Sequence, residues 1–316
     1  EAADWSINGS EYTHTATGTV VNVTNVETVD YSVVPSTTHD ITGTETYTGT
    51  AGDDVVNVNT SDDGHDITLL GGDDTVTINN DNSQNSTYDL GDGNDSFTID
   101  GRDFQGNSID LGEGNNTFTS YDARMAINNT ITAGSGNDVI DLTQNLTYSD
   151  LGDSTVDLGN GDNTVLIGGS GNSFRNDITL GSGDDLVDIS GDGQHDNTIS
   201  FGTGSDTLNL STTSGTTGNT FSFSDGNDSI SIAGQNNTQE INLTGTGNTI
   251  NETGTNNTTT INLNGDAAVN VSTAGAGNTL NLDGTGATDA VTLEGEAADW
   301  SINGSEYTHT ATGTVV

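Results

Sequence analysis

Pairs of apolar residues separated by one polar residue recur along residues 49–295. Successive pairs begin at residues 88, 97, 109 and 118, so the distance between them alternates between 9 and 12 residues. The pairs include Tyr88/Leu90, Phe97/Ile99, Ile109/Leu111, Ile178/Leu180, Val187/Ile189, Ile199/Phe201, Leu208/Leu210, Phe221/Phe223, Ile230/Ile232, Ile241/Leu243 and Ile261/Leu263. Alternation with a period of two is typical of a strand that buries one face, and no helical periodicity competes with it. The pattern predicts an all-β fold, a parallel β-solenoid of about a dozen coils of ~21 residues with two strands in each coil.

The composition agrees with a stacked fold. Only 29% of the 316 residues are hydrophobic, which is too few for a conventional globular core, so each coil must bury its aliphatic side chains against its neighbours. A chain with this mean charge and hydropathy is disordered unless its charge is neutralised. Cys is absent, so disulfides and thiolate metal sites are excluded, and any metal must prefer oxygen ligands.

A second repeat spans almost the whole chain. The segment EAADWSINGSEYTHTATGTVV at 1–21 recurs unchanged at 296–316, an offset of 295 residues. The chain therefore consists of one full repeat and the beginning of the next. Either the chain duplicates its own end, or it is a window from a longer tandem array, and we favour the array.

The nine-residue step between apolar pairs contains a glycine-rich turn. Residues 91–97 read Gly-Asp-Gly-Asn-Asp-Ser-Phe, and 134–140, 181–187 and 202–208 follow the same pattern, G-x-G-[ND]-D-x-hydrophobic. Glycines allow positive φ, so that several carbonyl oxygens can point to one place, and the Asp adds a carboxylate. Successive turns can together supply the 6–8 oxygen ligands, at about 2.3–2.6 Å, that Ca²⁺ prefers.

Electrostatics also favours a cation. The aspartates at the end of the motif lie one coil apart or a multiple of it, at Asp54, Asp74, Asp95, Asp138, Asp185, Asp206 and Asp228. At the spacing of about 4.8 Å between strands, two unit charges repel by about 3.5 kcal/mol at an effective dielectric of 20. The chain has no Lys to neutralise such a column. A solvated acidic surface is the alternative, but it does not explain why the aspartates keep one register behind two glycines.

These turns resemble the RTX, or hemolysin-type calcium-binding, repeat G-G-x-G-x-D-x-U-x, in which U is a large apolar residue. The resemblance covers 49–232. It implies that Ca²⁺ binds between adjacent coils of a parallel β-roll, and that the chain is secreted unfolded and folds in calcium outside the cell. The sequence departs from the pattern because Leu90, Leu111, Leu158 or Leu180 replaces the first glycine. Each coil is also longer than two nonapeptides, so only one turn of each coil should bind Ca²⁺ in this way. A single column of sites follows.

The expected metal-binding residues combine the motif glycines and acidic residues. They are Asp54, Asp74, Gly91, Asp92, Gly93, Asp95, Gly134, Gly136, Asp138, Gly181, Gly183, Asp185, Gly202, Gly204, Asp206, Asp225 and Asp228. Asn116 and Asn163 replace the ligand Asp in two turns, which should bind weakly. Beyond residue 232 we assign Thr249, Ala267 and Thr279 to the ligand position. Coils there should stack without calcium, through aliphatic residues and Asn/Thr ladders.

The domain organisation follows from these patterns. Residues 1–48 are expected to be a β-rich spacer that continues or caps the solenoid, with a separate small β domain as the alternative. Residues 49–232 are the calcium-binding coils, 233–295 are continuing coils with degraded motifs, and 296–316 begin the next repeat. The longer turns carry Asn before the strand, as at Asn107, Asn197 and Asn219, and stacked Asn residues can form amide ladders.

Charge and motifs limit the function classes. A net charge of −44 would repel phosphate backbones, which excludes nucleic-acid binding. No apolar stretch approaches the roughly 20 residues of a membrane span, and no leader opens the chain. The five His residues are scattered and no catalytic signature occurs, so no enzymatic activity is expected. Ice binding would need Thr repeatedly at the third motif position, which instead varies.

A structural role remains. We expect a secreted, extracellular or cell-surface structural protein, the calcium-stabilised tandem-repeat unit of a giant bacterial or archaeal filament, matrix fibre or adhesin stalk. Its partners would be adjacent repeats or neighbouring filaments of the same protein, with surface polysaccharide as a further possibility. A surface-layer lattice protein is the alternative, and a polysaccharide-binding or ice-binding module comes after it.

Overall fold

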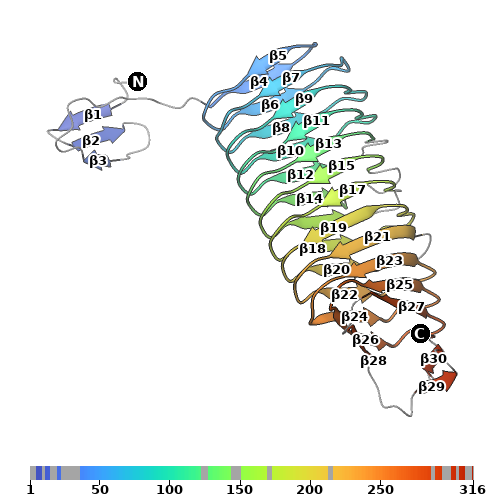
Figure 1. The fold of residues 1–316 in the computed structure, drawn as a ribbon. Coiled ribbons are helices and arrows are strands. Elements are labelled where there is room, and N and C mark those ends of the chain that lie inside the picture. The colour runs from blue at the N-terminus through green and yellow to red at the C-terminus, as the bar shows by residue number, and fades with distance from the viewer. Residues whose placement is uncertain are drawn as a thin grey trace.

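The computed structural model is a parallel β-solenoid, as the apolar pattern predicts (Figure 1). It describes residues 5–8, 11–14, 20–22, 36–121, 127–143, 151–168, 173–212, 216–285, 289–293, 300–303, 306–309 and 315. Every regular element in these ranges is a strand. The described residues contain no helix that is long and apolar enough to cross a membrane.

One face of the solenoid is a 13-stranded sheet made of even-numbered strands, called here the even sheet. Its strands are β4 (Thr38–Ile41), β6 (Val55–Val58), β8 (Thr75–Ile78), β10 (Ser96–Ile99), β12 (Thr117–Ser120), β14 (Val139–Leu142), β16 (Thr164–Ile167), β18 (Leu186–Ile189), β20 (Thr207–Leu210), β22 (Ser229–Ile232), β24 (Asn248–Glu252), β26 (Ala268–Thr273) and β28 (Ala290–Leu293).

The opposite face is a 12-stranded sheet of odd-numbered strands, the odd sheet. Its strands are β5 (Thr46–Thr48), β7 (Asp66–Thr68), β9 (Thr87–Asp89), β11 (Ser108–Asp110), β13 (Thr130–Thr132), β15 (Thr155–Asp157), β17 (Asp177–Thr179), β19 (Thr198–Gly202), β21 (Thr217–Phe223), β23 (Thr238–Leu243), β25 (Thr258–Leu263) and β27 (Thr279–Gly284). From β6 to β25, a longer turn leads from an even strand to the next odd strand and a shorter turn leads back, whereas the turn from β4 to β5 is shorter than the turn from β5 to β6.

The register of the strands places the apolar pairs in one continuous core. Each strand pairs in parallel with the strand one coil away, so that Phe97 aligns with Val76 on one side and Phe118 on the other. The rings of Phe97 and Phe118 stack with centroids 5.6 Å apart. Both members of each predicted pair are buried between the two sheets. Burial by stacking thus accounts for an ordered fold with few apolar residues.

Smaller antiparallel units lie at the two ends of the chain. β1 (Trp5–Asn8), β2 (Glu11–His14) and β3 (Val20–Asn22) form a three-stranded sheet, and β29 (Trp300–Asn303) pairs with β30 (Glu306–His309). The expected spacer 1–48 also overlaps the solenoid, because β4 and β5 already pair with β6 and β7. Residues 23–35 of that spacer lie outside the described residues.

The long turns carry the amide ladder that their Asn residues predict. The N–H of Asn176 donates to Oδ1 of Asn197 (3.1 Å), and the N–H of Asn197 donates to Oδ1 of Asn219 (2.9 Å). Nδ2 of Asn197 also donates to the carbonyl of Ser173 (3.1 Å). The same contacts recur along the chain at Ser86, Asn107, Asn129, Ser154, Asn237, Asn257 and Asn278. These side chains satisfy the buried backbone of the turns.

One carboxyl group lies inside the aliphatic core. Glu252 is fully buried and aligns with Ile232 in the even sheet. Its Oε1 has no hydrogen-bond donor, and Oε2 lies 3.5 Å from the Thr259 hydroxyl. Burial raises the pKa of Glu252 to about 7, although hydrogen bonds from Asn257 and Thr259 oppose the shift. A neutral carboxylic acid therefore occupies this position in the folded protein at mildly acidic pH.

Glu252 should make the stability depend on pH. Between its ordinary pKa of 4.5 and about 7, the unfolded chain releases the proton and the folded chain retains it, so the free energy of unfolding falls as pH rises through this range. Glu252→Gln, which cannot ionise, should remove that fall, a difference of up to about 3 kcal/mol at pH 8. Denaturant unfolding at pH 4.5 and 8, at fixed calcium, measures it. The exposed Glu240→Gln is the control, and equal slopes in the two variants would contradict the assignment.

Candidate metal centre

The short turns are built to stack with their backbones in close contact. Gly91 and Gly93 have φ of 90° and 153°, which side chains disfavour. A Cβ on Gly93 would also collide with the carbonyl oxygen of Gly72, one coil away, and a Cβ on Gly114 with that of Gly93. The glycines are therefore required both for the turn and for the approach of adjacent turns. A Cβ would also collide with a carbonyl oxygen of the adjacent turn at the other predicted glycines with positive φ, which are Gly136, Gly181, Gly183, Gly202 and Gly204.

The motif aspartates form a buried ladder. The N–H of Asp74 donates to Oδ1 of Asp95 (2.7 Å), and the N–H of Asp95 donates to Oδ1 of Asn116 (2.8 Å). The N–H of Asp185 likewise donates to Oδ1 of Asp206 (2.9 Å). This inner ladder comprises Asp54, Asp74, Asp95, Asn116, Asp138, Asn163, Asp185, Asp206, Asp228 and Asn248, all buried. The structure thus aligns the predicted aspartates vertically, each bonded to the backbone of its neighbour.

The second carboxylate oxygen of most of these aspartates is left without a donor. Oδ2 is buried and makes no hydrogen bond in Asp74, Asp95, Asp138, Asp185, Asp206 and Asp228. An isolated buried charge of this kind is costly, and such groups are normally protonated, paired or bound to metal. The inner ladder therefore contains six oxygens that require a partner.

The asparagine positions of the same ladder show where that second atom points. Nδ2 of Asn116 donates to the carbonyl oxygens of Gly112 and Gly114, both at 3.2 Å. Nδ2 of Asn248 donates to the carbonyl of Thr244 (3.1 Å). At an aspartate position the corresponding atom is an oxygen, which has no hydrogen to donate to a carbonyl. A proton or a cation must then lie among these oxygens.

The pKa values reflect this environment. Burial raises the pKa of Asp95 and Asp185 to about 7, although each accepts a backbone hydrogen bond that works the other way. Burial likewise raises the pKa of Asp74 and Asp206 to about 6, and the charge of the neighbouring aspartate adds to the shift. Without a cation these carboxyl groups hold protons more strongly than usual.

Asp54 differs from the other predicted ligands. Its Oδ1 accepts from the Thr37 N–H (2.5 Å) and hydroxyl (2.8 Å), and its Oδ2 accepts from the Thr50 N–H (2.6 Å). Burial would raise the pKa of Asp54, but these hydrogen bonds outweigh it and lower the value. Its carboxylate is already satisfied as an anion, so it has less need of a metal ion than the aspartates that follow.

A second ladder, not foreseen from the sequence, lies on the outside of the short turns. It runs in the opposite direction: the N–H of Asn94 donates to Oδ1 of Asp73 (2.8 Å), and the N–H of Ser205 donates to Oδ1 of Asp184 (2.8 Å). This outer ladder comprises the exposed residues Asp53, Asp73, Asn94, Asn115, Asn137, Asp162, Asp184 and Ser205. The [ND] alternation in the motif was the signal, because either side chain supplies the acceptor.

Two predicted ligands lie apart from the inner ladder. Asp92 and Asp225 are exposed on the short turn, and the backbone of Asp92 forms parallel bridges with Gly71 and Glu113. Their side chains are not in the buried column. Gly134, by contrast, lies in the turn, where its N–H donates to the carbonyl of Gly112 (2.8 Å).

Side chains alone do not complete a metal site. Across the described ranges, no group of three or more His, Asp or Glu side chains could hold a metal ion. Each aspartate would have to act with backbone carbonyl oxygens, as the turn motif predicts. Buried carboxylate oxygens beside carbonyls are an all-oxygen donor set, which fits Ca²⁺ rather than a softer metal.

Beyond residue 232, two of the three residues assigned to the ligand position lie elsewhere in the structure. The ladder position after Asp228 is Asn248, not Thr249. Oδ1 of Asn248 accepts the N–H of Asp228, whereas Thr249 faces outward from β24 and is exposed. In the next coil Val269 aligns with Asn248. Thr279 lies in the odd sheet and was wrongly assigned to this turn. Ala267 is a buried residue just before β26. Ala267 does occupy the ladder position, as predicted, because its N–H donates to Oδ1 of Asp289 in the following coil (3.1 Å). The inner ladder therefore has no carboxylate at Asn248 and Ala267, and one returns at Asp289.

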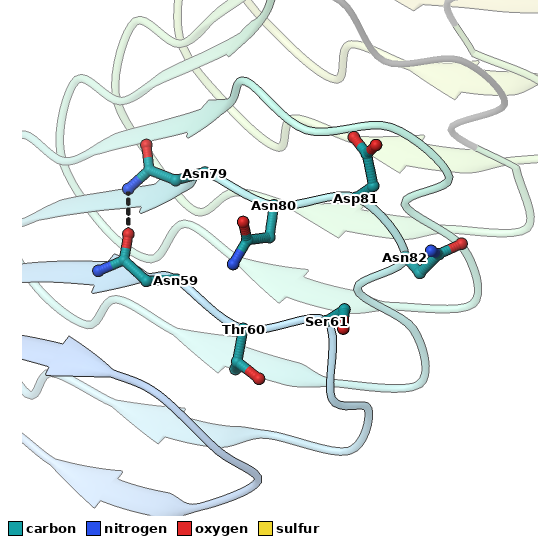
Figure 2. Close-up of a pocket in the computed structure, with 7 residues that line it drawn as sticks. All are labelled: Asn59, Thr60, Ser61, Asn79, Asn80, Asp81 and Asn82. Atoms are coloured by element: carbon teal, nitrogen blue, oxygen red, sulfur yellow. Dashed lines mark hydrogen bonds between the residues drawn. The ribbon is translucent and has the colours of Figure 1, made fainter.

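A polar groove lies at the long turns that come directly after the even strands β6 and β8. It is lined by Asn59, Thr60, Ser61, Asn79, Asn80, Asp81 and Asn82, which Figure 2 shows on two adjacent coils. Nδ2 of Asn79 donates to Oδ1 of Asn59 (3.0 Å), and Asp81 accepts from the Arg102 N–H (2.9 Å). The groove has no aromatic or aliphatic wall of the kind that usually lines a small-molecule site.

Comparison of the chain with protein-family models, curated proteins and solved structures finds no match. The turn motif and the geometry of the inner ladder are the features that favour a metal centre.

In metal-free buffer, the inner ladder should make the protein less stable as pH rises. Between the ordinary Asp value of 3.8 and the raised pKa of about 7 for Asp95, the unfolded chain binds fewer protons than the folded chain, so the free energy of unfolding falls over this range. Asp95→Asn should reduce the slope, and the exposed Asp92→Asn, which removes an equal charge but only a minor cause of the raised pKa of Asp95, should reduce it much less. Thermal melts at pH 4.5 and 6, where part of the carboxyl groups still hold their protons, measure this by circular dichroism. Identical slopes for both variants would contradict it.

Proposed function

We propose that this chain is a calcium-stabilised structural repeat of an extracellular filament, matrix fibre or adhesin stalk. The observation that carries the proposal is the column of six buried carboxylate oxygens without a hydrogen-bond donor. A protein that kept these groups as unpartnered anions would be unstable. The resemblance of the turns to RTX repeats independently suggests the same ion.

The ions would be held along one edge of the solenoid. Two runs of consecutive aspartates offer the densest charge, one ending at Asp95 and the other comprising Asp185, Asp206 and Asp228, with Asp138 isolated between two Asn positions. The carbonyls of the glycine turns, such as those of Gly91 and Gly93, would complete the donor set. Bound Ca²⁺ would supply the positive charge that the carboxylates lack and would link oxygens of adjacent turns.

Calcium would then act as a folding switch. A metal that binds only the stacked coils stabilises them by mass action, and the unfolded chain has the charge and composition of a disordered one. Affinities of about 10⁻⁴–10⁻³ M, typical of extracellular calcium modules, would keep the chain unfolded inside a cell and folded outside it. This supports a secreted location.

The mechanical role follows from the shape. At about 4.8 Å per coil, a dozen stacked coils extend for roughly 60 Å, and the repetition of 1–21 at 296–316 supports a tandem array of such blocks. A surface-layer lattice is the alternative, which differs in having lateral rather than end-to-end contacts, and a polysaccharide-binding or ice-binding module is less well supported.

Replacing one aspartate of the inner ladder by asparagine should separate its contribution to calcium binding from its effect on the stability of the fold. Asp185→Asn should bind about one Ca²⁺ fewer and should stabilise the metal-free protein by about 1–3 kcal/mol, because an amide can donate where the orphaned oxygen cannot. The neighbouring Asp184→Asn, in the outer ladder, keeps its acceptor and should leave the number of ions unchanged, with a smaller gain in stability because it removes only a nearby repulsive charge. Isothermal titration calorimetry gives the number of ions, and refolding by the osmolyte TMAO in chelator gives the stability of the metal-free protein.

Calcium dependence itself is tested by chelation. Circular dichroism should show loss of β-structure in excess EGTA and recovery on adding Ca²⁺. Retention of the full signal in EGTA at pH 7.5 would contradict the proposal. Electron microscopy of the native assembly then distinguishes a fibre from a lattice, and glycan-array binding would favour the polysaccharide module.

A further inference from the structure

The two sheets of the solenoid contain unequal numbers of strands. The even sheet has 13 strands and the odd sheet 12, because the described solenoid begins and ends with an even strand, β4 and β28. Since even and odd strands alternate along the chain, a solenoid that continued beyond β28 would next need an odd strand, placed on the outer edge of β27.

A residue of the next repeat occupies that place. Val315 forms a parallel bridge with Thr279, the first residue of β27. The N–H of Val315 donates to the carbonyl of Asn278 (2.8 Å), and its carbonyl accepts from the N–H of Leu280 (2.6 Å). Bonds to the residues before and after the bridged partner are the pattern of a parallel ladder.

The sequence that follows Val315 in a tandem array fits the same edge. Val315 is the counterpart of Val20, 295 residues earlier, so it would be followed by the equivalents of Val21, Asn22 and Val23. In the observed register these place one Val opposite Leu280 and another opposite Leu282, on the inward-facing side. Leu282 is 37% exposed, one of four large apolar residues of the described chain left this open. The added strand would cover it.

The same segment has a different partner at the N-terminal end. Val20–Asn22 forms β3, which pairs in antiparallel fashion with β2. Residues 20–22 are thus compatible with two pairings, one with their own hairpin and one with the edge of a preceding solenoid. The even sheet can continue in the same way, since Val291 and Leu293 of β28 are only partly buried.

We propose that consecutive repeats form one uninterrupted solenoid, in which residues 20–23 of each repeat are the thirteenth strand of the odd sheet. The interface is the β27/β28 edge of one repeat, and its partner is a second copy of this chain, which contributes residues 20–23 and then β4. The hairpin β29–β30 is an insertion between two solenoid strands. Each repeat has 13 coils in both sheets, and neither edge is left open to aggregation. The proposal rests on the tandem array proposed above, and not on calcium.

Hydrogen exchange on the 316-residue chain tests the junction directly. In saturating calcium, the Leu280 amide should exchange at least tenfold more slowly than in Val315→Pro, which cannot donate to Asn278, or in the chain shortened to residues 1–295. Val315→Thr, which keeps both backbone bonds, should protect Leu280 as the original chain does. The Thr279 amide, which donates to Asn257 within the solenoid (2.8 Å), is the internal control. Equal exchange of Leu280 in all four proteins overturns the proposal.

Two joined copies, residues 1–295 followed by 1–316, test continuity on a larger scale. Small-angle scattering should give one straight rod whose maximum dimension exceeds that of the single repeat by about 60 Å, and the proline substitution at the junction should bend it. A flexible pair of rods without the substitution overturns the proposal. A failure of the calcium proposal has a different signature, because Leu280 protection and the rod would then persist in EGTA.

Discussion

The solenoid depends on one repeated hydrogen bond, in which a side-chain oxygen of each short turn accepts the backbone N–H of the adjacent turn. The glycines let the turns approach until this bond can form, and the bond leaves the acceptor side chain buried in the corner of the coil. Asp and Asn supply the acceptor equally well, as the contacts of Asp95 and Asn116 show. They differ only in the second terminal atom of the side chain. In Asn116 this atom is Nδ2, which donates to carbonyl oxygens, and in Asp95 it is Oδ2, which receives no hydrogen bond. The choice between Asp and Asn therefore leaves the backbone contact unchanged and decides whether a coil must hold a proton or a cation at that position.

The long and short turns of each coil provide acceptors for buried backbone N–H groups with different side chains. The long turns use mainly Asn and Ser, so their buried ladder contains no carboxylate, and most of its side chains donate to a carbonyl as Asn197 does, although Nδ2 of Asn237 has no partner. The short turns between Asp74 and Asp228 use mainly Asp, so their ladder is charged and incomplete. The proposed calcium requirement would consequently be confined to one edge of the solenoid and to part of its length. The coils at Asn248 and Ala267 have no carboxylate in the inner ladder, whereas Asp289 in the last coil again supplies one, which accepts the N–H of Ala267 (3.1 Å).

The fold could be predicted from the sequence because its signal is periodic. The apolar pairs and their alternating spacing fix the two sheets, and the Gly-x-Gly turns fix one corner. The ladder contacts were harder to foresee, since spacing gives the position of a residue in its coil but not the direction of its side chain. The assignments of Thr249 and Thr279 failed for a related reason: coil length changes after residue 228, and a slip of one residue exchanges inward and outward positions. The outer ladder was missed because Asp and Asn on a turn look like solvated residues.

The distribution of apolar and charged groups favours association along the axis over lateral packing. The described lateral surface offers few exposed large apolar residues, Val55, Leu70 and Tyr121, whereas Leu282 lies at the open end of the odd sheet. A net charge of −44 repels parallel rods at distances shorter than the Debye length of roughly 8 Å. Backbone pairing at the ends is much less sensitive to this repulsion, because the edge strands present N–H and C=O groups rather than carboxylates. A lattice would need cations to bridge acidic side faces, whereas a fibre needs only the strand pairing that Val315 already makes.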